Sequence, residues 1–409
     1  MSEVTTEAQK MSPYQRKAVG AATFGLGLQS MSTMLLSFVL VTMIADFGIS
    51  KTAGGMISTV TNIGMLVGGL IFGPIADRFG RVKTLAVTVA IFSLATLATG
   101  FAGNIALVYV FRFLVGVGGG GEYGVVMSLV ADAFSKERRG RVTSWVTISG
   151  QIGAIVAALA AAVLVPNFGW RGLFIFGGVP IVLAVWVWFA LPESEKWKSA
   201  RHAVGDTPAD KISIGELFTN GRASTTLRLM LMATVQVAGY FGLMNWLPSI
   251  IQKQAGLAVS GSSVWMTATI GGMILGMLLF GQLMDRVGPK WAYGSFLVAS
   301  AIAVFIYPFA HSTATILIGG AIVGFFANGM NAGYGAIVGN LYPMRIRATA
   351  NNIIFNIGRA VGGFSSVAIG FFLDHYTLTV AMGFLAILYI LSFLTVLTLR
   401  VNRTGAAEE

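Results

Sequence analysis

Three charged residues stand inside long apolar stretches of this sequence, where a charge is costly to place. Arg112 and Glu122 fall in the stretch 104–131, and Arg359 falls in the stretch 349–373. Charged side chains in such stretches commonly serve a ligand, an ion pathway or an internal partner. Arg112 and Glu122 are ten residues apart, which is roughly 15 Å along a helix axis, so the two cannot pair directly within one helix.

Each of these charges suggests a definite chemistry. A guanidinium binds a carboxylate through two parallel hydrogen bonds, so Arg112 and Arg359 are candidate substrate-binding residues. Burial in a medium of low dielectric constant favours the protonated form of a carboxylate, so Glu122 is a candidate proton-coupling residue. The competing interpretation is structural: each arginine ties neighbouring helices through backbone carbonyls, and Glu122 is the permanent partner of an arginine or a tyrosine.

Polar residues in other apolar stretches could complete a binding cavity. Amides and aromatic rings beside an arginine suit an aromatic or hydroxylated acid. Asn328, Asn331 and Tyr334 follow the i, i+3 spacing that places side chains on one helix face. Any one of these residues more commonly forms a hydrogen bond between helices. Besides the arginines, the predicted substrate-binding residues are Gln29, Tyr240, Asn245, Asn328, Asn331, Tyr334 and Asn356, and Gln151 and Gln236 belong to the same polar set.

The composition indicates a protein that is solvated by lipid. The 409 residues are 55% hydrophobic and 11% charged, whereas a soluble domain carries about 25% charged residues. The net charge of +11 does not indicate nucleic acid as a partner, because the basic residues fall in alternate short loops. The absence of cysteine excludes disulfides and thiol chemistry.

The sequence carries no sign of an enzyme or of a bound cofactor. It has no phosphate-binding glycine loop of the ATPase type and no evident pairing of a nucleophile with a base. His202, His311 and His375 lack the spacing of metal ligands. We therefore expect no catalysis and no metal, and a proton as the coupling ion.

Twelve apolar segments of about 20 residues or more are each long enough to cross a bilayer. They fall into two sets of six that flank one long polar stretch. This predicts an N-terminal six-helix bundle in 1–191, a cytoplasmic linker in 192–225 and a C-terminal six-helix bundle in 226–409. The segments are 18–45, 52–76, 83–102, 104–131, 141–165, 171–191, 226–252, 259–284, 290–310, 313–341, 349–373 and 377–399.

The basic residues set the expected orientation. Arg78, Arg81 and Lys83 share one loop, and further lysines and arginines occupy the linker and every second loop. The loops between them offer only Lys51, Arg171 and Lys253. By the positive-inside rule, both termini and the linker are expected in the cytoplasm, with the protein in the cytoplasmic (inner) membrane.

One loop motif occurs twice, at a separation of about half the chain. The first copy runs from Gly73 to Lys83 with the sequence GPIADRFGRVK, and the second runs from Gly281 to Lys290 with the sequence GQLMDRVGPK. The shared glycines, aspartate and arginine are each 208 residues apart. Such a fixed offset indicates that the chain contains two copies of one unit.

This motif, between the second and third apolar segments, resembles the signature loop of the major facilitator superfamily of membrane transporters. The resemblance implies an all-α integral membrane protein with twelve transmembrane helices in two pseudo-symmetric six-helix bundles. It also implies that Asp77 and Arg81 latch the cytoplasmic helix ends in the outward-open state. Pro289 replaces the matching arginine in the second copy. The gating residues implied are Gly73, Asp77, Arg78, Gly80, Arg81, Asp285 and Arg286.

Within that superfamily, four short elements resemble the proton symporters of aromatic acids, sialic acid and related carboxylates. They are the tail of the first apolar segment from Ser37 to Ser50, Gly-Glu-Tyr at 121–123, Trp170-Arg171 and the Gly-Arg pair that ends at Arg359. Aromatic-acid members carry an Asp-Gly-x-Asp pair in the first helix, whereas this chain has no aspartate there. Either Glu122 alone binds the proton, or coupling is altered.

The expected function is proton-coupled uptake of a small organic anion, such as an aromatic acid, a sugar acid or sialate, by alternating access. Its partners would be that anion, a proton and the lipid bilayer, and one chain holds both halves, so a monomer is expected. Two alternatives stay open. A proton-driven exporter of drugs or metabolites is disfavoured by two buried arginines. A non-transporting membrane sensor is disfavoured by the intact loop motifs.

Overall fold

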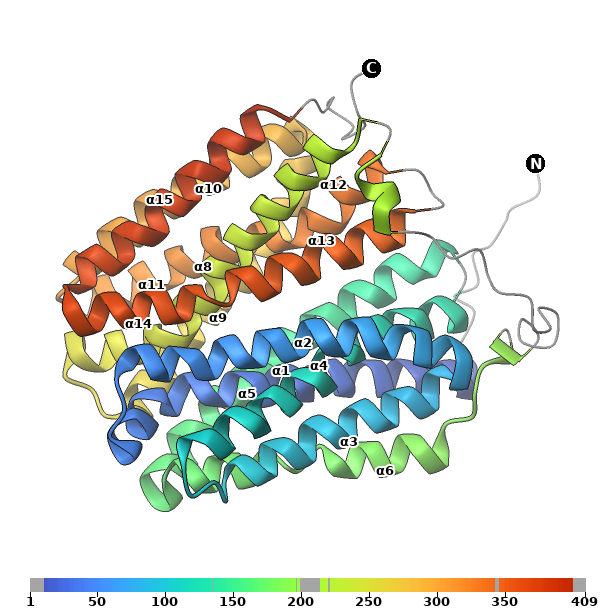
Figure 1. Ribbon diagram of the computed structural model, residues 1–409, viewed down its shortest axis with the longest axis horizontal. Helices are drawn as coiled ribbons and strands as arrows, with labels where there is room; N and C mark the ends of the chain where they lie inside the picture. Colours follow the sequence, from blue (N-terminus) through green and yellow to red (C-terminus); the bar gives the residue numbers. More distant parts are fainter. Residues whose placement is uncertain are drawn as a thin grey trace, which may run out of the picture.

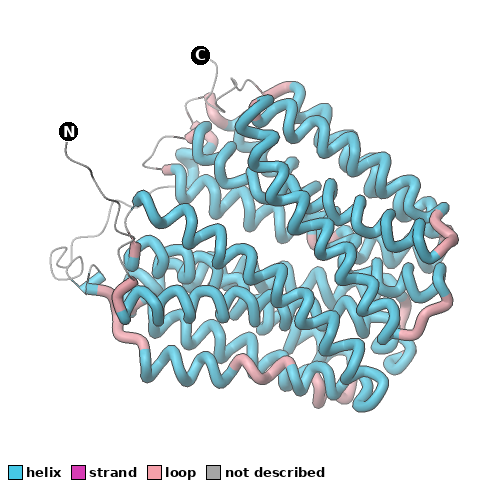
Figure 2. Tube along the Cα trace, turned by 180° about the vertical axis from the view of Figure 1, so that it is seen from behind, coloured by secondary structure: helices cyan, strands magenta, loops and turns pink. Residues whose placement is uncertain are grey.

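The protein is helical throughout the part that its structure describes. The computed structural model describes residues 11–134, 136–195, 197–198, 214–219, 221–342 and 346–399, and these ranges contain no strand. Figure 2 shows this part as helices joined by short loops. Half of the predicted linker 192–225, namely residues 196, 199–213 and 220, lies outside the described residues.

The helices of the first half follow one another with short connections. At Gly169, where φ is 64°, non-helical backbone interrupts the fifth helix, and the chain turns back so that Trp170 lies near Asp46 and the following residues run along the third helix. The helices are α1 (Pro13–Phe47), α2 (Lys51–Phe79), α3 (Arg81–Thr99), α4 (Ile105–Ala133), α5 (Lys136–Phe176) and α6 (Ile181–Ala190).

The second half is also helical, but two of its crossings are interrupted. A 3-10 segment, η3, separates α11 from α12, and Gly363 and Phe364 separate α13 from α14. The described elements are η1 (Ile214–Leu217), α8 (Ala223–Ala255), α9 (Val259–Val287), α10 (Pro289–Ile306), η2 (Tyr307–Phe309), α11 (Thr313–Gly329), η3 (Met330–Gly333), α12 (Tyr334–Leu341), α13 (Arg347–Gly362), α14 (Ser365–His375) and α15 (Leu378–Leu397).

The number of crossings agrees with the sequence prediction. Among the described residues, ten stretches are long and apolar enough to span a membrane, and the stretch Trp145–Ala190 contains the turn at Gly169 and so crosses twice. The shorter apolar helix Thr313–Gly329 supplies the remaining crossing. The predicted all-α fold with twelve crossings is therefore confirmed.

Short polar side chains fix where several helices begin. The side-chain oxygens of Ser12, Ser50, Asn104, Ser312 and Thr377 each accept a hydrogen bond from a backbone N–H in the first turn of the helix that follows. Such caps satisfy donors that have no partner within the helix. The helices therefore begin at defined residues. The short loops between them keep successive helices antiparallel.

Glycines let neighbouring helices approach backbone to backbone. In the first half, a Cβ added to Gly64 or Gly68 of α2 would collide with the carbonyls of Phe113 and Val117 in α4. In the second half, Gly272 and Gly276 of α9 stand in the same relation to carbonyls of α11. These pairs are again 208 residues apart, so the duplication includes the helix contacts. In lipid, where the hydrophobic effect does not drive helices together, such close packing does.

The backbone conformation of the loop motif requires glycine at two of its positions. Gly80 joins α2 directly to α3 with φ at 111°, and Gly288 joins α9 to α10 with φ at 82°. Glycine adopts such positive φ angles at little cost, whereas other residues rarely do. A single residue can therefore reverse the chain at the end of both helices.

The two halves meet at one end of the molecule. Figure 1 shows α14 beside the first turns of α2, and the ribbons of the two halves diverge toward the end that carries both termini. A Cβ on Gly55 would collide with the backbone of Ser366, and one on Gly370 would collide with the backbone of Lys51. We call the end at which α1 ends and α2 begins the closed end.

The glycine contacts predict the effect of a larger side chain on stability. In Gly276→Val the new side chain would meet the carbonyl of Phe325, and such overpacking costs about 1–3 kcal/mol. We expect a clearly lower melting temperature of the purified protein in detergent. Gly271→Val is the matched control, because a Cβ at Gly271 of the same helix meets nothing within 4 Å. Equal melting temperatures for the two variants would contradict this packing.

Candidate functional site

A cavity lies between the two halves, and both contribute to its lining. It encloses about 170 Å³, whereas a dry cavity of about 150 Å³ can bind benzene, so it suits a ligand of about one substituted ring. Its lining comes from α1, α2, α4 and α5 on one side and from α8, α11, η3 and α13 on the other. The residues are Leu26, Gln29, Ser30, Thr33, Met34, Met65, Gly119, Tyr123, Gly150, Gln151, Gln236, Val237, Tyr240, Phe241, Asn328, Asn331, Phe355 and Arg359.

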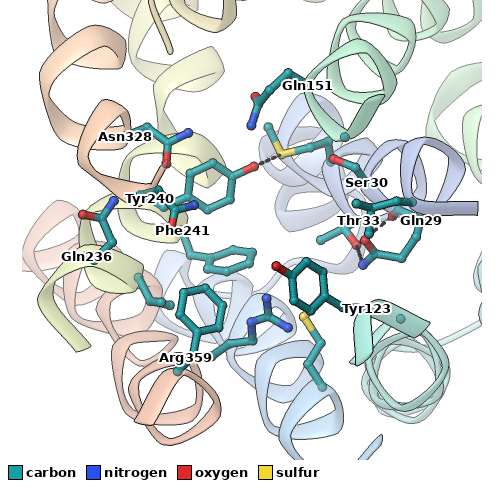
Figure 3. A pocket seen from close by; sticks show the side chains of 18 residues that line it. Gln29, Ser30, Thr33, Tyr123, Gln151, Gln236, Tyr240, Phe241, Asn328 and Arg359 are labelled. Carbon is teal, nitrogen blue, oxygen red and sulfur yellow. Dashed lines mark hydrogen bonds between the residues drawn. The ribbon is translucent and has the colours of Figure 1, made fainter. Parts of the chain in front are cut away.

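Arg359 brings a positive charge into this cavity. Its guanidinium carbon lies 5.0 Å from the centroid of the Phe355 ring, one turn earlier on α13. Figure 3 shows the guanidinium facing the Tyr123 side chain across the cavity. Its Nε has no hydrogen-bond partner among the described residues, and none of the described lining residues is an aspartate or a glutamate. A guanidinium in such a place can pair with an anionic group that enters the cavity.

Aromatic rings form the walls around the middle of the cavity. Tyr240 and Phe241 of α8 are packed edge to face with their ring centroids 5.0 Å apart. The Tyr240 hydroxyl lies 3.8 Å from the sulfur of Met34 on α1, as Figure 3 shows. Tyr123 reaches the cavity from α4. These rings make the middle of the cavity largely apolar.

The 208-residue offset relates cavity positions in the two halves. Gln151 on α5 corresponds to Arg359 on α13, and Tyr123 on α4 corresponds to Asn331 in η3. Both members of each pair line the cavity. Equivalent positions therefore face the cavity from two sides, and among the described lining residues only the second half supplies a cation.

The structure places Arg112 outside this cavity. The side chain is 1% exposed, and its two terminal nitrogens donate to the carbonyls of Ser32 and Thr33 on α1, each at 3.3 Å. Its guanidinium carbon lies 5.9 Å from the ring of Phe174. These contacts agree with the structural interpretation of Arg112, in which the arginine ties α4 to α1. Thr33 lines the cavity, so Arg112 lies directly behind the wall.

Glu122 also lies apart from the cavity lining, inside the first half. It is 0% exposed, and neither carboxylate oxygen has a hydrogen-bond partner among the described residues. A Cβ on Gly25 of α1 would meet both this carboxylate and the side chain of Leu85 on α3, so Glu122 packs between these helices. The next residue, Tyr123, lines the cavity. Such a carboxylate suits the binding of a proton, and the proton-coupling role of Glu122 stays a prediction.

Of the nine predicted substrate-binding residues, five line the cavity. Arg112 and three others lie elsewhere. Gln29, Tyr240, Asn328, Asn331 and Arg359 are brought together. In contrast, Tyr334 donates to the carbonyl of Leu229 inside the second half. Tyr334 does not line the cavity with Asn328 and Asn331, because it is buried and its hydroxyl is bound to the backbone of α8. Asn356 donates to the carbonyl of Asn352 at 2.9 Å and lies against Gly69 of α2.

Asn245, the third of these, joins the two halves near the closed end. Its Oδ1 accepts from Ser37 Oγ of α1 at 3.1 Å, and its Nδ2 donates to Ser58 Oγ of α2 at 2.6 Å. Nδ2 also lies 3.3 Å from Ser366 Oγ of α14. Thr59 donates to the carbonyl of Gly363 at 2.9 Å. This buried polar layer seals the halves together and does not line the cavity.

Asp374 completes the seal, and the sequence analysis missed it. From the end of α14 its carboxylate accepts hydrogen bonds from the backbone N–H groups of Lys51 and Thr52 at 3.1 and 2.9 Å, and from the Thr52 hydroxyl at 2.8 Å. A carboxylate at a helix N-terminus is stabilised by the helix dipole. One half of the chain thus caps a helix of the other half, which no spacing within the sequence could indicate.

The loop motif anchors helices within the first half. Arg81 pairs with Asp132 of α4 and donates to the carbonyl of Ser128 at 3.0 Å. Ser194 donates to the same Asp132 at 2.9 Å. Glu193 accepts from the backbone N–H groups of Val82 and Lys83 at 3.1 and 3.0 Å, which caps α3. Asp132, Glu193 and Ser194 were absent from the predicted set.

The other predicted gating residues lie at helix ends. Arg78 is exposed, with its guanidinium carbon 5.4 Å from the Phe79 ring. Asp285 and Arg286 are exposed in the last turn of α9. Gly73 and Gly281 have nothing within 4 Å of an added Cβ. Asp77 lies in α2, but its side chain is outside the described part of the structure. A latching role for these residues stays a prediction.

Comparison with known proteins identifies the family. The model of the Major Facilitator Superfamily matches residues 22–276 and 229–409. The chain belongs to the major facilitator superfamily. This confirms the family that the repeated loop motif predicted. Members of this superfamily similar to this chain are transport proteins and not enzymes, and the chain is accordingly a multi-pass membrane transporter.

Several curated superfamily members resemble the chain along most of its length. A protein of Haemophilus influenzae, named in general terms as a metabolite transport protein, is 34% identical over 97% of this chain and 99% of its own length. The cis,cis-muconate transport protein of Acinetobacter baylyi is 30% identical over 87% of this chain and 89% of its own. The sialic acid transporter NanX of Escherichia coli is 26% identical over 90% of this chain and 89% of its own.

A solved structure supports the same fold. The crystal structure of a D-xylose–proton symporter matches with a TM-score of 0.80 and 18% sequence identity, over 97% of this chain and all of that chain. At this identity the likeness concerns the arrangement of helices and not the substrate.

The seal at the closed end predicts how its loss changes the conformation. In Asp374→Ala the hydrogen bonds from α2 to α14 are lost, which costs about 1 kcal/mol at this partly exposed position. We expect roughly a fivefold rise in the ratio of separated to closed forms. Spin labels on cysteines introduced at Phe101 and Tyr376, two exposed residues of different halves, would measure the separation, since the chain has no cysteine of its own.

Asp46→Ala is the matched control for that measurement. Asp46 is also a carboxylate at the closed end, but it accepts from Trp170 and Arg171 of its own half, at 3.0 and 2.9 Å. The control should leave the distance distribution unchanged. An equal shift in both variants, or none in Asp374→Ala, would contradict the assignment of Asp374 to the seal.

Proposed function

We propose that this transporter moves a small organic anion across the membrane together with a proton, by alternating access. The observation that carries the proposal is the Arg359 guanidinium, which lines a cavity between the two halves where none of the described lining residues is acidic. The names of relatives that carry muconate and sialic acid support an organic acid as the substrate. The cavity volume of about 170 Å³ favours a small acid.

The proposed cycle uses the two ends of the molecule in turn. With both termini in the cytoplasm of the cell, the closed end faces outside, and the structure represents a state that is sealed to the outside. In the opposite state the contacts of Asn245 and Asp374 separate, and the anion enters and meets Arg359. Return of the seal then exposes the cavity to the cytoplasm. We place the protein in the cytoplasmic membrane as a monomer, because one chain supplies both walls of the cavity.

Glu122 is proposed to bind the coupling proton. Its carboxylate is buried without a partner, and burial favours the neutral form. It packs against Gly25 of α1, while Tyr123 beside it faces the substrate. Movement of α1 against α4 would therefore change the access of water to Glu122 and the shape of the cavity together. Such linkage is what coupling requires.

The competing proposal of a proton-driven exporter fits this cavity less well. Cationic amphiphiles would meet the Arg359 guanidinium without an acidic residue to offset it. A cavity that suits about one substituted ring also leaves little room for large drugs. Transport of cationic dyes by the purified protein, with no transport of carboxylates, would favour the exporter.

The role of Arg359 predicts the behaviour of Arg359→Gln, which places in α13 the residue found at the equivalent position 151. Loss of a charge-assisted pair costs about 3 kcal/mol, or roughly a hundredfold in affinity. Uptake of labelled aromatic, sugar and short-chain acids by proteoliposomes would measure this loss. Arg171→Gln is the control, because Arg171 is an exposed partner of Asp46. Unchanged uptake of an acid in Arg359→Gln would reject the proposal.

The role of Glu122 predicts a separation of exchange from accumulation. Glu122→Gln keeps the side-chain volume but cannot bind and release a proton. We expect this variant to exchange labelled for unlabelled acid across the membrane, while an imposed pH gradient no longer drives net accumulation. Wild-type protein with the gradient collapsed by a protonophore provides the reference. Gradient-driven accumulation by Glu122→Gln would show that the proton binds elsewhere.

A further inference from the structure

Tyr123 is the one large side chain that α4 places among the described residues of the cavity lining. The other lining residue from this helix is Gly119, and a spacing of four residues puts the two on one helix face. Tyr123 is 45% exposed, and Arg359 is partly exposed. A ligand in the cavity can therefore reach both side chains.

The hydroxyl of Tyr123 is directed at the charge of the other half. Figure 3 shows this hydroxyl turned toward the guanidinium of Arg359, and both residues line the same cavity. A phenol O–H and a guanidinium N–H are both hydrogen-bond donors. A carboxylate has two oxygens with several lone pairs and can accept from both groups at once.

Packing fixes each of these side chains to its own half. The guanidinium carbon of Arg359 lies 5.0 Å from the ring centroid of Phe355, which precedes it by one turn of α13. In the first half, a Cβ on Gly120 would collide with the backbone of Met65 on α2, so α4 is packed tightly against α2. Tyr123 therefore moves with the first half and Arg359 with the second.

The repeat supplies an uncharged counterpart of this pair. At the offset of 208 residues, Tyr123 corresponds to Asn331 and Arg359 corresponds to Gln151. All four residues line the cavity. The counterpart consists of two neutral amides, which bind a carboxylate less strongly than a charged donor does. The carboxylate of a ligand is therefore expected between Tyr123 and Arg359.

The second tyrosine of the described lining is directed elsewhere. The hydroxyl of Tyr240 lies 3.8 Å from the sulfur of Met34, and Figure 3 shows it turned away from the guanidinium of Arg359. Of the two tyrosine hydroxyls, that of Tyr123 is the one placed to share an anion with Arg359.

We propose that Tyr123 is a second binding residue for the substrate carboxylate, and that its hydroxyl donates a hydrogen bond to the group that Arg359 holds. This inference rests on the proposed function, in which Arg359 binds the anion. Because Arg359 belongs to α13 and Tyr123 to α4, the bound carboxylate connects the two halves. The anion is thus held from both sides of the space that must close around it.

Calorimetric titration of the purified full-length protein with benzoate, glucuronate and propionate tests the proposal. Tyr123→Phe keeps the ring and removes only the hydroxyl. Loss of a hydrogen bond to a charged group lowers affinity by roughly tenfold or more. We therefore expect each acid that binds the wild-type protein to bind Tyr123→Phe about tenfold more weakly.

Infrared spectra of the bound acid report on the carboxylate itself. With an isotope-labelled carboxylate and the protein saturated with the acid, loss of the hydroxyl should shift the carboxylate stretching band in Tyr123→Phe. A role of Tyr123 in folding alone would leave this band unchanged at saturation.

Tyr109→Phe is the matched control variant. Tyr109 lies on the same helix, and its hydroxyl donates to the carbonyl of Ala53 at 3.0 Å. It does not line the cavity, so this variant should bind the acids as the wild-type protein does and leave the band in place.

The outcomes separate this inference from the proposed function. Suppose that Arg359→Gln loses the acid while Tyr123→Phe keeps wild-type affinity or an unshifted band, or that Tyr109→Phe loses as much as Tyr123→Phe. This inference is then overturned and the proposed function stands. If none of the acids binds, or if binding is the same in Arg359→Gln, both are overturned.

Discussion

A single positive charge in a water-poor space between two helical bundles is the constraint on which this structure depends. A charge at the centre of a bilayer costs at least about 2.5–3.5 kcal/mol, and Arg359 has no acidic residue among the described lining of its cavity. Aromatic rings from both halves lie beside the guanidinium, with Phe355 on α13 and Tyr123 on α4. An anion that reaches this charge replaces the lost hydration, so affinity and the closure of the halves are linked.

The duplication keeps the scaffold alike and makes the binding chemistry unequal. The glycine contacts between α2 and α4 recur between α9 and α11 with the same offset, because close backbone packing admits no other residue. Inside the cavity the equivalent positions have diverged, with Gln151 opposite Arg359 and with Gly120 in place of Asn328. Among the described lining residues, the second half therefore supplies the cation. The first half supplies the buried carboxylate Glu122, which lies outside the cavity.

The sequence predicted what depends on composition and on regular helices. Apolar length gave the crossings, and the cost of a buried charge singled out Arg359. The positions of Asn245 and Tyr334 could not be predicted in the same way. Tyr334 donates to a carbonyl of α8 that lies 105 residues away along the chain, and Asn245 faces a seal that exists only when the two halves meet. The same applies to Asp374, whose partners lie more than 300 residues away along the chain. Tyr123 and Phe355 were missed because an aromatic ring in an apolar segment carries no signal of its own.

The most direct test of the account is an experimental structure of the protein with a transported acid bound. The account predicts that the carboxylate lies in the cavity between the halves, within about 3 Å of the Arg359 guanidinium nitrogens. It also predicts that Arg112 keeps its contacts with the carbonyls of α1. An acid that binds at Arg112, or that lies in the cavity with its carboxylate turned away from Arg359, would contradict the central claim.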